Sequence, residues 1–320
     1  MSRGFKFFFI GFVFSLPLFW GANVFQKNLE DFLFWEKISD NPQLLAAQII
    51  QEDKLEQLKP IRNWQIPNLE ISAKSAISVF LDSTGNKKVL FSKESDRVLP
   101  IASLTKLMTA NVVLENYDLS QMVEISKQAV EEEEDIGNFK VGEFFTVEQL
   151  LYSLLMESSN DAAGALSQVI GKKAFIDLMN LEAENLGLKN THFVNLAGLD
   201  PDEPNGPVNY STTEDLADLA FYLLKTKPLI FEILRTSELD FFSSDGIFHH
   251  KIINNNQLLG KIPSIVGGKT GETPKASGCL LLVIKAPDSK GYLINVILGS
   301  ADRFGEMQKL IDWLNSAYKW

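Results

Sequence analysis

The longest apolar run of the chain lies near its N-terminus, at residues 7–25, where Ser15 and Asn23 are the clearly polar members. As a helix, this run would be roughly 28 Å long, which is close to the thickness of the hydrocarbon core of a bilayer. Arg3 and Lys6 precede the run, and basic residues before a span favour a cytoplasmic N-terminus with the rest of the chain outside. The pattern therefore predicts a single membrane span.

A cleaved signal peptide is the alternative for this segment. Signal peptidase requires small residues at its cleavage site, but no A-x-A-like site follows the run, and in Trp20-Gly21-Ala22 the third position back is the bulky Trp20. We therefore expect residues 1–27 to be a retained anchor or uncleaved signal that contacts the lipid bilayer through residues 7–25. Residues 28–70, which include an amphipathic helical stretch at 44–55, are expected to be a juxtamembrane spacer.

Strand-like and helix-like patterns alternate from residue 71 to the end of the chain. Residues 76–81 and 89–91 flank a turn at 82–86 and predict a β-hairpin. Further strand-like runs lie near the C-terminus, at residues 265–266, 279–284 and 292–298.

The centre of the chain is predicted to be helical. A capping box at Thr146–Gln149 opens one helix, and a second capping box at Ser211–Glu214 opens another. Further helices are expected at residues 172–186 and 303–318. Strands from both ends of the chain with helices between them indicate an α+β fold, in which an antiparallel sheet is flanked by helices and joined to a helical cluster.

Composition and charge exclude several classes of function. The 320 residues carry 41 acidic and 30 basic side chains and no basic stripe, so no nucleic acid is expected as a partner. Cys279 is the only cysteine, lies in a strand-like apolar run and is expected to be buried. The three histidines lack metal-site spacing, and the acidic run at residues 131–135 lacks the spacing of a calcium loop. No metal or cofactor is expected.

The first candidate for chemistry is Ser103, which is followed three residues later by Lys106. Residues three apart share one face of a helix, so the amine can reach the hydroxyl. Serine becomes a nucleophile when a neighbouring base takes its proton, and lysine can be that base when burial or nearby charge lowers its pKa. The pattern is short, and in most proteins an isolated S-x-x-K is a helix cap followed by a solvated lysine.

Two further short motifs follow in the chain. Ser158 and Asn160 end a predicted apolar helix, and they either cap the next helix or supply a proton-shuttling hydroxyl and a substrate-binding amide. Lys269, Thr270 and Gly271 follow a glycine pair, and they either begin an ordinary strand or bind a substrate carboxylate. Glycine at this point allows a backbone to approach a ligand closely.

The order S-x-x-K, S-x-N, K-T-G is more specific than any one of these motifs and resembles the penicillin-binding and serine β-lactamase superfamily. The surrounding residues narrow the resemblance to the serine-type D-alanyl-D-alanine carboxypeptidase family. The similar segments are residues 100–109, 150–163, 191–200 and 267–271. The resemblance runs over residues 71–320, which it identifies as a catalytic domain with the transpeptidase/β-lactamase-like fold.

The resemblance implies a role for each motif residue. Ser103 is the implied nucleophile, Lys106 its general base, and Ser158 the relay that protonates the departing D-Ala amine. The backbone N–H groups of Ser103 and Glu272 are the implied oxyanion hole. The residues implied to bind substrate are Asn160, Lys269, Thr270, Gly271 and Arg303.

The resemblance also implies a function and a place in the cell. We expect the chain to remove the terminal D-Ala from peptidoglycan stem pentapeptides, in cell wall biogenesis and remodelling, and to be acylated by β-lactams. Its catalytic domain is expected outside a single-pass anchor in the cytoplasmic membrane. Glu272, where relatives more often carry an aromatic or histidine side chain, departs from the pattern and places a carboxylate near the expected carboxylate site.

Three alternatives stay open at this point. A peptidoglycan D,D-endopeptidase of the same family carries the same motifs. A class A β-lactamase also needs a glutamate for deacylation, usually in E-x-x-L-N, and no such string lies between Asn160 and Lys269. A non-catalytic peptidoglycan-binding protein is disfavoured because the motif residues are intact.

Overall fold

The computed structural model describes residues 26, 28–29, 60–130, 137–287 and 291–320. The predicted anchor at 7–25, the amphipathic stretch at 44–55 and the acidic run at 131–135 lie outside the described residues. Within the described ranges, none of the helices combines the length and apolar character that crossing a bilayer requires. The chain divides into two compact units, residues 1–61 and 62–320, and the second unit contains the fold described below.

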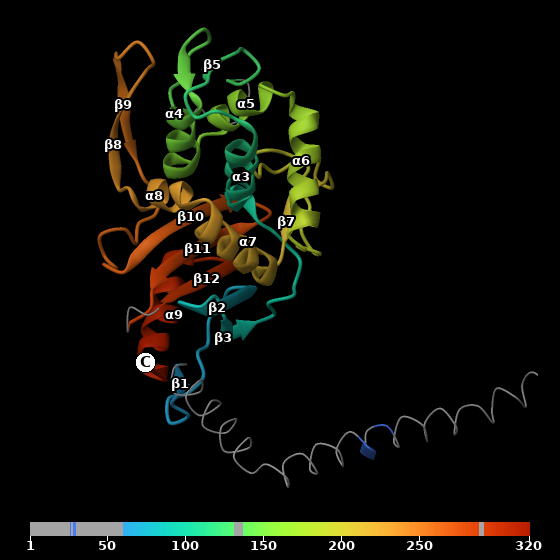
Figure 1. Cartoon of the computed structure of the whole chain (residues 1–320), viewed down its shortest axis with the longest axis vertical. Helices are drawn as coiled ribbons and strands as arrows, with labels where there is room; N and C mark the ends of the chain where they lie inside the picture. The colour runs from blue at the N-terminus through green and yellow to red at the C-terminus, as the bar shows by residue number, and fades with distance from the viewer. Residues whose placement is uncertain (1–25, 27, 30–59, 131–136, 288–290) are drawn as a thin grey trace, which may run out of the picture. The chain divides into compact units, whose positions relative to one another are not determined.

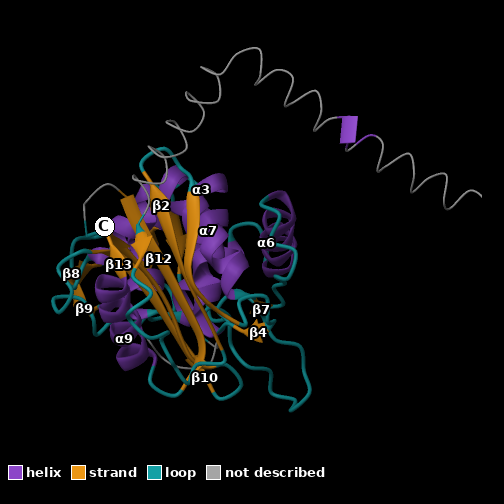
Figure 2. Cartoon of the chain, turned by 90° about the horizontal axis from the view of Figure 1, so that it is seen from below, coloured by secondary structure: helices purple, strands orange, loops and turns teal. Residues whose placement is uncertain are grey.

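A five-stranded antiparallel sheet forms the centre of the second unit (Figures 1 and 2). Its strands, in spatial order, are β10 (Ile265–Thr273), β11 (Ser277–Lys285), β12 (Gly291–Ser300), β2 (Ser75–Asp82) and β3 (Lys87–Lys93). The predicted hairpin is confirmed as β2 and β3, and the pairing of β12 with β2 joins segments from the two ends of the unit. The α+β fold with an antiparallel sheet is therefore confirmed.

The first C-terminal strand is longer than the sequence pattern suggests. We expected it at residues 265–266, but β10 continues through the glycine pair and the K-T-G motif to Thr273. Each of these residues pairs with an apolar or small residue of β11, for example Lys269 with Leu281. Cross-strand pairing thus maintains a strand where local composition does not indicate one.

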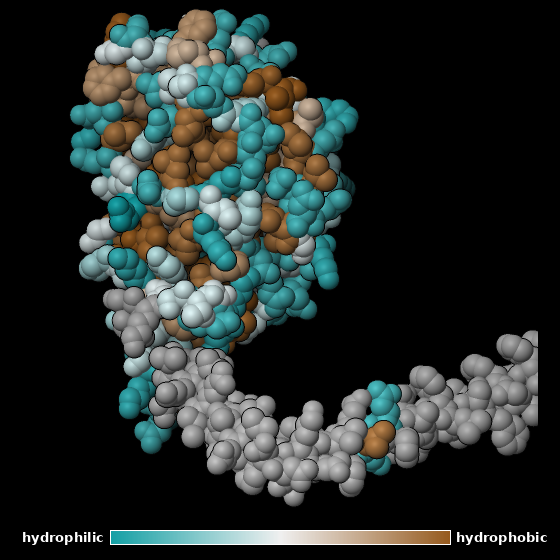
Figure 3. Space-filling model, in the orientation of Figure 1, coloured by the Kyte–Doolittle hydropathy of each residue, from teal (hydrophilic) through white to brown (hydrophobic). Residues whose placement is uncertain are grey.

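Helices cover both faces of the sheet. Helix α9 (Arg303–Ala317) packs on one face, and α7 (Thr213–Thr226) and α8 (Pro228–Arg235) pack on the other (Figure 2). The helical cluster contains α3 (Lys106–Asn116), α4 (Val147–Tyr152), α5 (Asn160–Gln168) and α6 (Lys172–Asn185). Figure 3 shows apolar side chains gathered over this cluster and bordered by polar ones.

Short elements connect the sheet and the cluster. A 3₁₀ turn, η1 (Ala102–Thr105), leads into α3, and a π-helical turn, η2 (Ser153–Glu157), follows α4. The remaining short strands are β1 (Ile61–Arg62), β4 (Leu99–Pro100), β5 (Met122–Glu124), β6 (Phe144–Thr146), β7 (Tyr210–Ser211), β8 (Glu238–Phe242), β9 (Phe248–Ile253) and β13 (Tyr318–Lys319). Among these short strands, β4 pairs with β7, β5 with β6, and β8 with β9.

Successive side chains of β11 point to opposite faces of the sheet and belong to two separate hydrophobic clusters. Leu280 and Leu282 pack in the cluster that contains Leu310 and Leu314 of α9, whereas Leu281 packs in the larger cluster under the other helices. Successive strand residues point to opposite faces, so a continuous apolar strand is what a sheet covered on both faces requires. Complete burial of one such leucine contributes about 1.5–3 kcal/mol.

Cys279 belongs to the larger cluster, as predicted, and its thiol is buried. Burial raises the pKa of the Cys279 thiol to about 11. The thiol therefore stays protonated at neutral pH, and a protonated thiol is a poor nucleophile.

One predicted capping box is confirmed, whereas at the second site a single side-chain cap, one residue later, replaces the predicted box. The Thr146 side chain accepts from the backbone N–H of Gln149. The Gln149 side chain accepts from the backbone N–H of Thr146, as predicted. At the second site, Thr212 is the cap and accepts from the N–H of Asp215. Ser211 is instead held in β7 by pairing with β4, so strand pairing moved the start of the helix.

Candidate active site

The predicted nucleophile and base meet at the start of α3. The Nζ atom of Lys106 lies 2.9 Å from the Oγ atom of Ser103, 2.8 Å from Oδ1 of Asn160 and 3.1 Å from the carbonyl oxygen of Ala197. Lys106 is fully buried. The two carbonyl oxygens can only accept hydrogen bonds, so the amine donates to both, whereas the Ser103 hydroxyl can accept or donate.

A left-handed residue directs Ser103 toward the site. Ala102, the first residue of η1, has a φ of 47°. A non-glycine residue in this region is strained, and such strain persists when surrounding contacts fix it. Ser103 is therefore the second residue of the short turn η1. Lys106, the first residue of α3, is buried next to it.

Ser158 also occupies a left-handed position. It follows the π-helical turn η2, with a φ of 70° and a ψ of 33°. Ser159 caps α5 by accepting from the N–H of Ala162, and Asn160 is the first residue of that helix. The change from α-helix to π-turn to a new helix brings Asn160 to Lys106.

Lys269 is the partner of Ser158. Its Nζ atom donates to Oγ of Ser158 at 2.9 Å and to the carbonyl oxygen of Thr270 at 3.0 Å. Burial lowers the pKa of Lys269 well below its usual value, and the positive charges of Lys106 and Arg303 add to that effect. Lysine in this environment releases its proton more readily than lysine in water.

The K-T-G segment runs along the free edge of the sheet beside η1, because β10 is an outer strand of the five. A Cβ atom on Gly271 would lie 2.9 Å from the backbone nitrogen of Ser103. Glycine is therefore required for the two backbones to approach this closely. Thr270 is buried beside Lys269 on the same strand.

Glu272 and Arg303 form an ion pair. The Arg303 side chain is mostly buried, with 19% of its area exposed, whereas 65% of the Glu272 side chain is exposed. Arg303 is the first residue of α9, and the side chain of Asp302 caps that helix by accepting from the N–H of Gly305. The unusual carboxylate after K-T-G thus contacts the arginine that the resemblance assigns to substrate binding.

A loop that sequence reasoning did not connect to the chemistry supplies the carbonyl of Ala197. Oδ1 of Asn195 accepts from the N–H groups of Ala197 and Gly198, and Oδ1 of Asn209 accepts from the N–H of Asn195. The Asn209 amide also donates to Oγ1 of Thr105 at 2.9 Å. The signal in the sequence is the asparagine followed three residues later by glycine, which is typical of a turn.

Gly198 fixes how closely this loop can approach η1. It has a φ of 86°, and a Cβ atom there would lie 1.9 Å from the carbonyl oxygen of Ala102. A glycine is therefore necessary both for its backbone conformation and for space.

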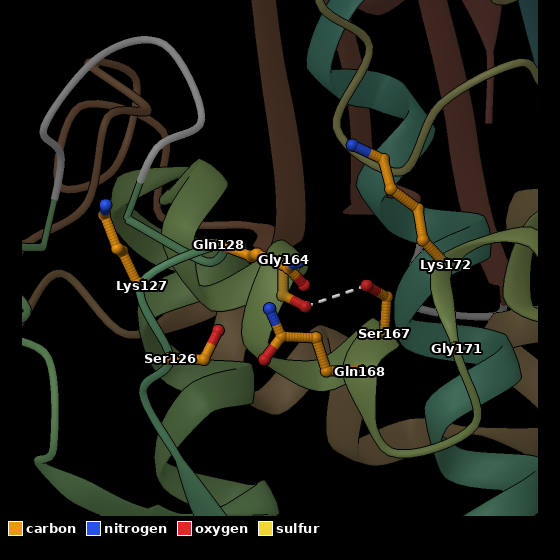
Figure 4. A pocket seen from close by; sticks show the side chains of 8 residues that line it. All are labelled: Ser126, Lys127, Gln128, Gly164, Ser167, Gln168, Gly171 and Lys172. Carbon is orange, nitrogen blue, oxygen red and sulfur yellow. Dashed lines mark hydrogen bonds between the residues drawn. The ribbon is translucent and has the colours of Figure 1, made fainter.

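A cavity of about 850 Å³ lies away from these residues. Figure 4 shows its polar lining, which includes Ser126, Lys127 and Gln168, and the hydrogen bond from Ser167 to the carbonyl oxygen of Gly164. None of the predicted site residues lines it. Across the described part of the chain, no group of three or more His, Cys, Asp or Glu side chains is placed to hold a metal ion.

Comparison with known sequences points to one family. Residues 62–302 match the sequence model of the D-alanyl-D-alanine carboxypeptidases. The chain is 32% identical over 261 residues to the D-alanyl-D-alanine carboxypeptidase DacF of Bacillus subtilis, a match that covers 77% of this chain and 63% of that relative. It is 33% identical over 253 residues to a D-alanyl-D-alanine endopeptidase of Pseudomonas aeruginosa, which covers 77% of this chain and 78% of the relative.

Solved structures of similar proteins share the fold. A DD-transpeptidase of Streptomyces has a TM-score of 0.69 and 30% identity, covering 78% of this chain and 100% of that one. A penicillin-binding protein of Listeria monocytogenes with ampicillin bound has a TM-score of 0.65 and 30% identity, covering 78% of this chain and 99% of that one.

Proposed function

The chain belongs to the D-alanyl-D-alanine carboxypeptidase family of serine peptidases, and we propose on this basis that it removes the terminal D-Ala from peptidoglycan stem pentapeptides. The observation that carries the proposal is the 2.9 Å contact between Nζ of Lys106 and Oγ of Ser103 in a buried setting. A hydroxyl in direct contact with an amine is the arrangement that nucleophilic catalysis by serine requires.

Acylation follows from this contact. Lys106 takes the proton of Ser103 as the serine oxygen bonds to the carbonyl carbon between the two D-Ala residues. The carbonyl oxygen becomes an oxyanion, which the backbone N–H groups of Ser103 and Glu272 stabilise. Donors held in place in this way typically contribute several kcal/mol each to transition-state stabilisation.

Ser158 and Lys269 serve the leaving group. The tetrahedral intermediate collapses as the C–N bond breaks, and Ser158 gives its proton to the departing amine nitrogen. Lys269 donates to Ser158 at 2.9 Å and has a lowered pKa, so it can return a proton to the Ser158 oxygen. The proton that Lys106 took from Ser103 then replaces the one that Lys269 gave up, so Lys106 is neutral again. Lys106 takes a proton from a water molecule as the water oxygen bonds to the ester carbon, and it returns that proton to the Ser103 oxygen as the shortened peptide leaves.

The terminal carboxylate of the substrate binds near the end of β10. Lys269, Thr270 and Arg303 supply positive charge and a hydroxyl, and Asn160 and Gly271 line the approach to Ser103. Because Glu272 already contacts Arg303, the incoming carboxylate competes with an internal one. β-Lactams carry a carboxylate at the corresponding place, so they acylate Ser103 as covalent inhibitors.

Cleavage of peptide crosslinks, the D,D-endopeptidase activity, is the second candidate. The Glu272–Arg303 ion pair reduces the net positive charge near Ser103, which lowers the preference for a free terminal carboxylate. A relative with 33% identity is named a D-alanyl-D-alanine endopeptidase. Turnover of a crosslinked dimer compared with turnover of a pentapeptide distinguishes the two activities.

Residues 1–27 are proposed to anchor the enzyme in the cytoplasmic membrane, with residues 28–70 as a spacer and the catalytic domain outside. The support is the apolar run at 7–25 with Arg3 and Lys6 before it. The chain should sediment with membranes, and protease added to spheroplasts should digest the catalytic domain. A soluble form that begins near Asn23 would show instead that the segment is a cleaved signal.

The direct test uses a fluorescent penicillin followed by a pentapeptide ending in D-Ala-D-Ala. Mass spectrometry should find the penicillin adduct on the peptide that contains Ser103 and the loss of one alanine from the substrate. A folded chain that forms no adduct and releases no alanine contradicts the proposal.

A further inference from the structure

Two successive histidines on β9 begin a series of contacts that ends beside Ser158. The Nδ1 atoms of His249 and His250 lie 2.7 Å apart. Nε2 of His250 lies 3.1 Å from a carboxylate oxygen of Glu157, and Nε2 of His249 lies 3.2 Å from one of Glu143. Glu157 directly precedes Ser158, so the two rings connect the β8–β9 hairpin to the segment that carries this serine.

A β-bulge explains how neighbouring side chains come together. Successive residues of a strand normally point to opposite faces. In this hairpin, Phe241 pairs with His250 and Phe242 pairs with Phe248, so His249 is the extra residue of a bulge. Bulges redirect a side chain, and this one brings the two imidazole rings to 4.9 Å between centroids.

The pair is enclosed rather than solvated. The side chains of His249, His250 and Glu157 are 9%, 14% and 12% exposed. The ring of His249 stacks on Phe139 at 5.7 Å, and Phe145 packs edge-on against it at 5.4 Å. Hydrogen bonds in such surroundings compete less with water than those on the surface.

These contacts fix the number of protons on the two rings. Two Nδ1 atoms at 2.7 Å need one proton between them, because two lone pairs repel and two N–H groups clash. Each Nε2 faces a carboxylate oxygen, which accepts a donated proton. The four ring nitrogens therefore share three protons, one more than two neutral rings carry and one fewer than two charged rings carry.

The carboxylates near the pair favour its positive charge, whereas Lys140 opposes it. Glu143 and Glu157 face the rings directly, and Lys140 and Asp245 line the groove beside His249. Lys251, the next residue of the strand, is paired with Glu238 instead.

The β8–β9 hairpin and the residues just after it contact both the side chain and the backbone of Glu157. Besides the contact with His250, the side chain of Glu157 accepts from Oγ of Ser153 at 2.6 Å. Its backbone carbonyl accepts from the Asn255 amide at 2.7 Å, just beyond β9. Ser158 follows in a left-handed conformation, which needs such fixed neighbours to persist.

We propose that His250 is a positioning residue for Ser158, that it acts through Glu157, and that it does so while the His249–His250 pair carries a single positive charge. The proposal rests on the proposed function, because acylation of Ser103 reports the position of Ser158. A second proton places an N–H on both Nδ1 atoms, so the rings must separate and Glu157 loses its fixed partner.

The test measures the acylation rate of the full chain in membranes with a fluorescent penicillin at several pH values. His250→Ala removes the contact with Glu157 and should slow acylation about tenfold at neutral pH. His250→Gln keeps an N–H donor but cannot be protonated. Its rate should stay within about threefold of wild type at neutral pH. Because other groups of the site also titrate, the informative quantity is the ratio of variant to wild-type rate, which should rise as the pH falls.

Lys251→Gln is the matched control, since Lys251 follows His250 on the strand and its ratio should stay near one at all pH values. Glu157→Gln provides a second measurement that does not depend on the folding of the alanine variant, and it should also slow acylation. Wild-type acylation with unchanged rates and pH-independent ratios in the His250 and Glu157 variants overturns this proposal alone. A wild-type chain that is never acylated overturns the proposed function, and this proposal with it.

Discussion

The two serines of the site are held in different ways. Ser103 and Lys106 are three residues apart on one stretch of helix, so their contact follows from helical spacing. Ser158 contacts Lys269 on a strand more distant in the chain, and its own position depends on a π-turn and a hairpin. The nucleophile and its base are a local arrangement, whereas the proton relay is assembled by tertiary structure.

This difference predicts how the Ser103–Lys106 pair and the Ser158–Lys269 relay respond to substitutions. A local pair is lost when one of its members is replaced, but it tolerates distant changes that leave the helix intact. A relay assembled from several elements is weakened in steps by changes in any of them.

Replacing either member of the local pair should abolish acylation. Ser103→Ala removes the nucleophile, and Lys106→Arg replaces the base with a group that stays protonated. Penicillin adducts measured by mass spectrometry should be absent from both variants, while circular dichroism of Ser103→Ala matches wild type. An arginine variant that is acylated at close to the wild-type rate would show that Lys106 only fills space.

Gly198→Ala should slow acylation by about a hundredfold or more, because displacing the Ala197 carbonyl misplaces the amine by a fraction of an ångström to an ångström. The added Cβ would lie 1.9 Å from the carbonyl oxygen of Ala102. Gly85→Ala is the matched control, since Gly85 has a φ of 94° and open space around it. Thermal unfolding should show a modest loss for Gly85→Ala and a larger loss for Gly198→Ala, and equal losses would contradict the steric explanation.

Lys269→Met should slow acylation by roughly ten- to a hundredfold, because Ser158 loses a charge-assisted hydrogen bond.

The free energy of unfolding, in contrast, should increase in this variant at neutral pH. The folded state lowers the pKa of Lys269, so the unfolded chain binds more protons below the usual pKa of lysine. Wild-type stability contributed by this group therefore rises with pH up to about pH 10, where the unfolded lysine also deprotonates.

Unfolding of Lys269→Met followed at several pH values checks that sign. The methionine variant should gain stability relative to wild type at neutral pH, and the gain should shrink as the pH approaches 10. A gain that grows with rising pH would be inconsistent with a lowered pKa.

Glu272→Gln should have the smallest effect, an increase of about two- to fivefold in kcat/KM for a pentapeptide. Removing the internal carboxylate frees Arg303 for the substrate carboxylate, and exposed ion pairs of this kind contribute less than about 1 kcal/mol. Steady-state release of D-Ala measures the change. A large loss of activity would instead give the Glu272 carboxylate a direct catalytic or structural role.

The same contrast separates what could be predicted from the sequence from what could not. The Ser103–Lys106 contact and the capping box at Thr146 depend on spacings of three residues, which the sequence displays directly. The capping box predicted at Ser211 is wrong: pairing of β7 with β4, which is not visible locally, holds Ser211 in a strand and leaves Thr212 as a simple cap of α7.

Groups that act through the backbone or across the fold were missed for the same reason. The carbonyl of Ala197 reaches Lys106 because Asn195 and Asn209 shape the loop, and no property of alanine signals that role. The Glu157–His250 contact joins residues on separate elements, and its bulge has no signature in the order of side chains. The ion pair of Glu272 with Arg303 likewise needed the fold to bring β10 and α9 together.

The pairing of β2 with β12 at the centre of the sheet has a consequence for how the protein is made. Val79 and Ile294 are register partners, so the middle of the sheet cannot form until almost the whole chain has emerged from the ribosome. Contacts between such distant segments also slow folding, because a long loop must close before any pairing energy is gained. The central sheet therefore remains incomplete until β12 has been synthesised, so this part of the fold forms late.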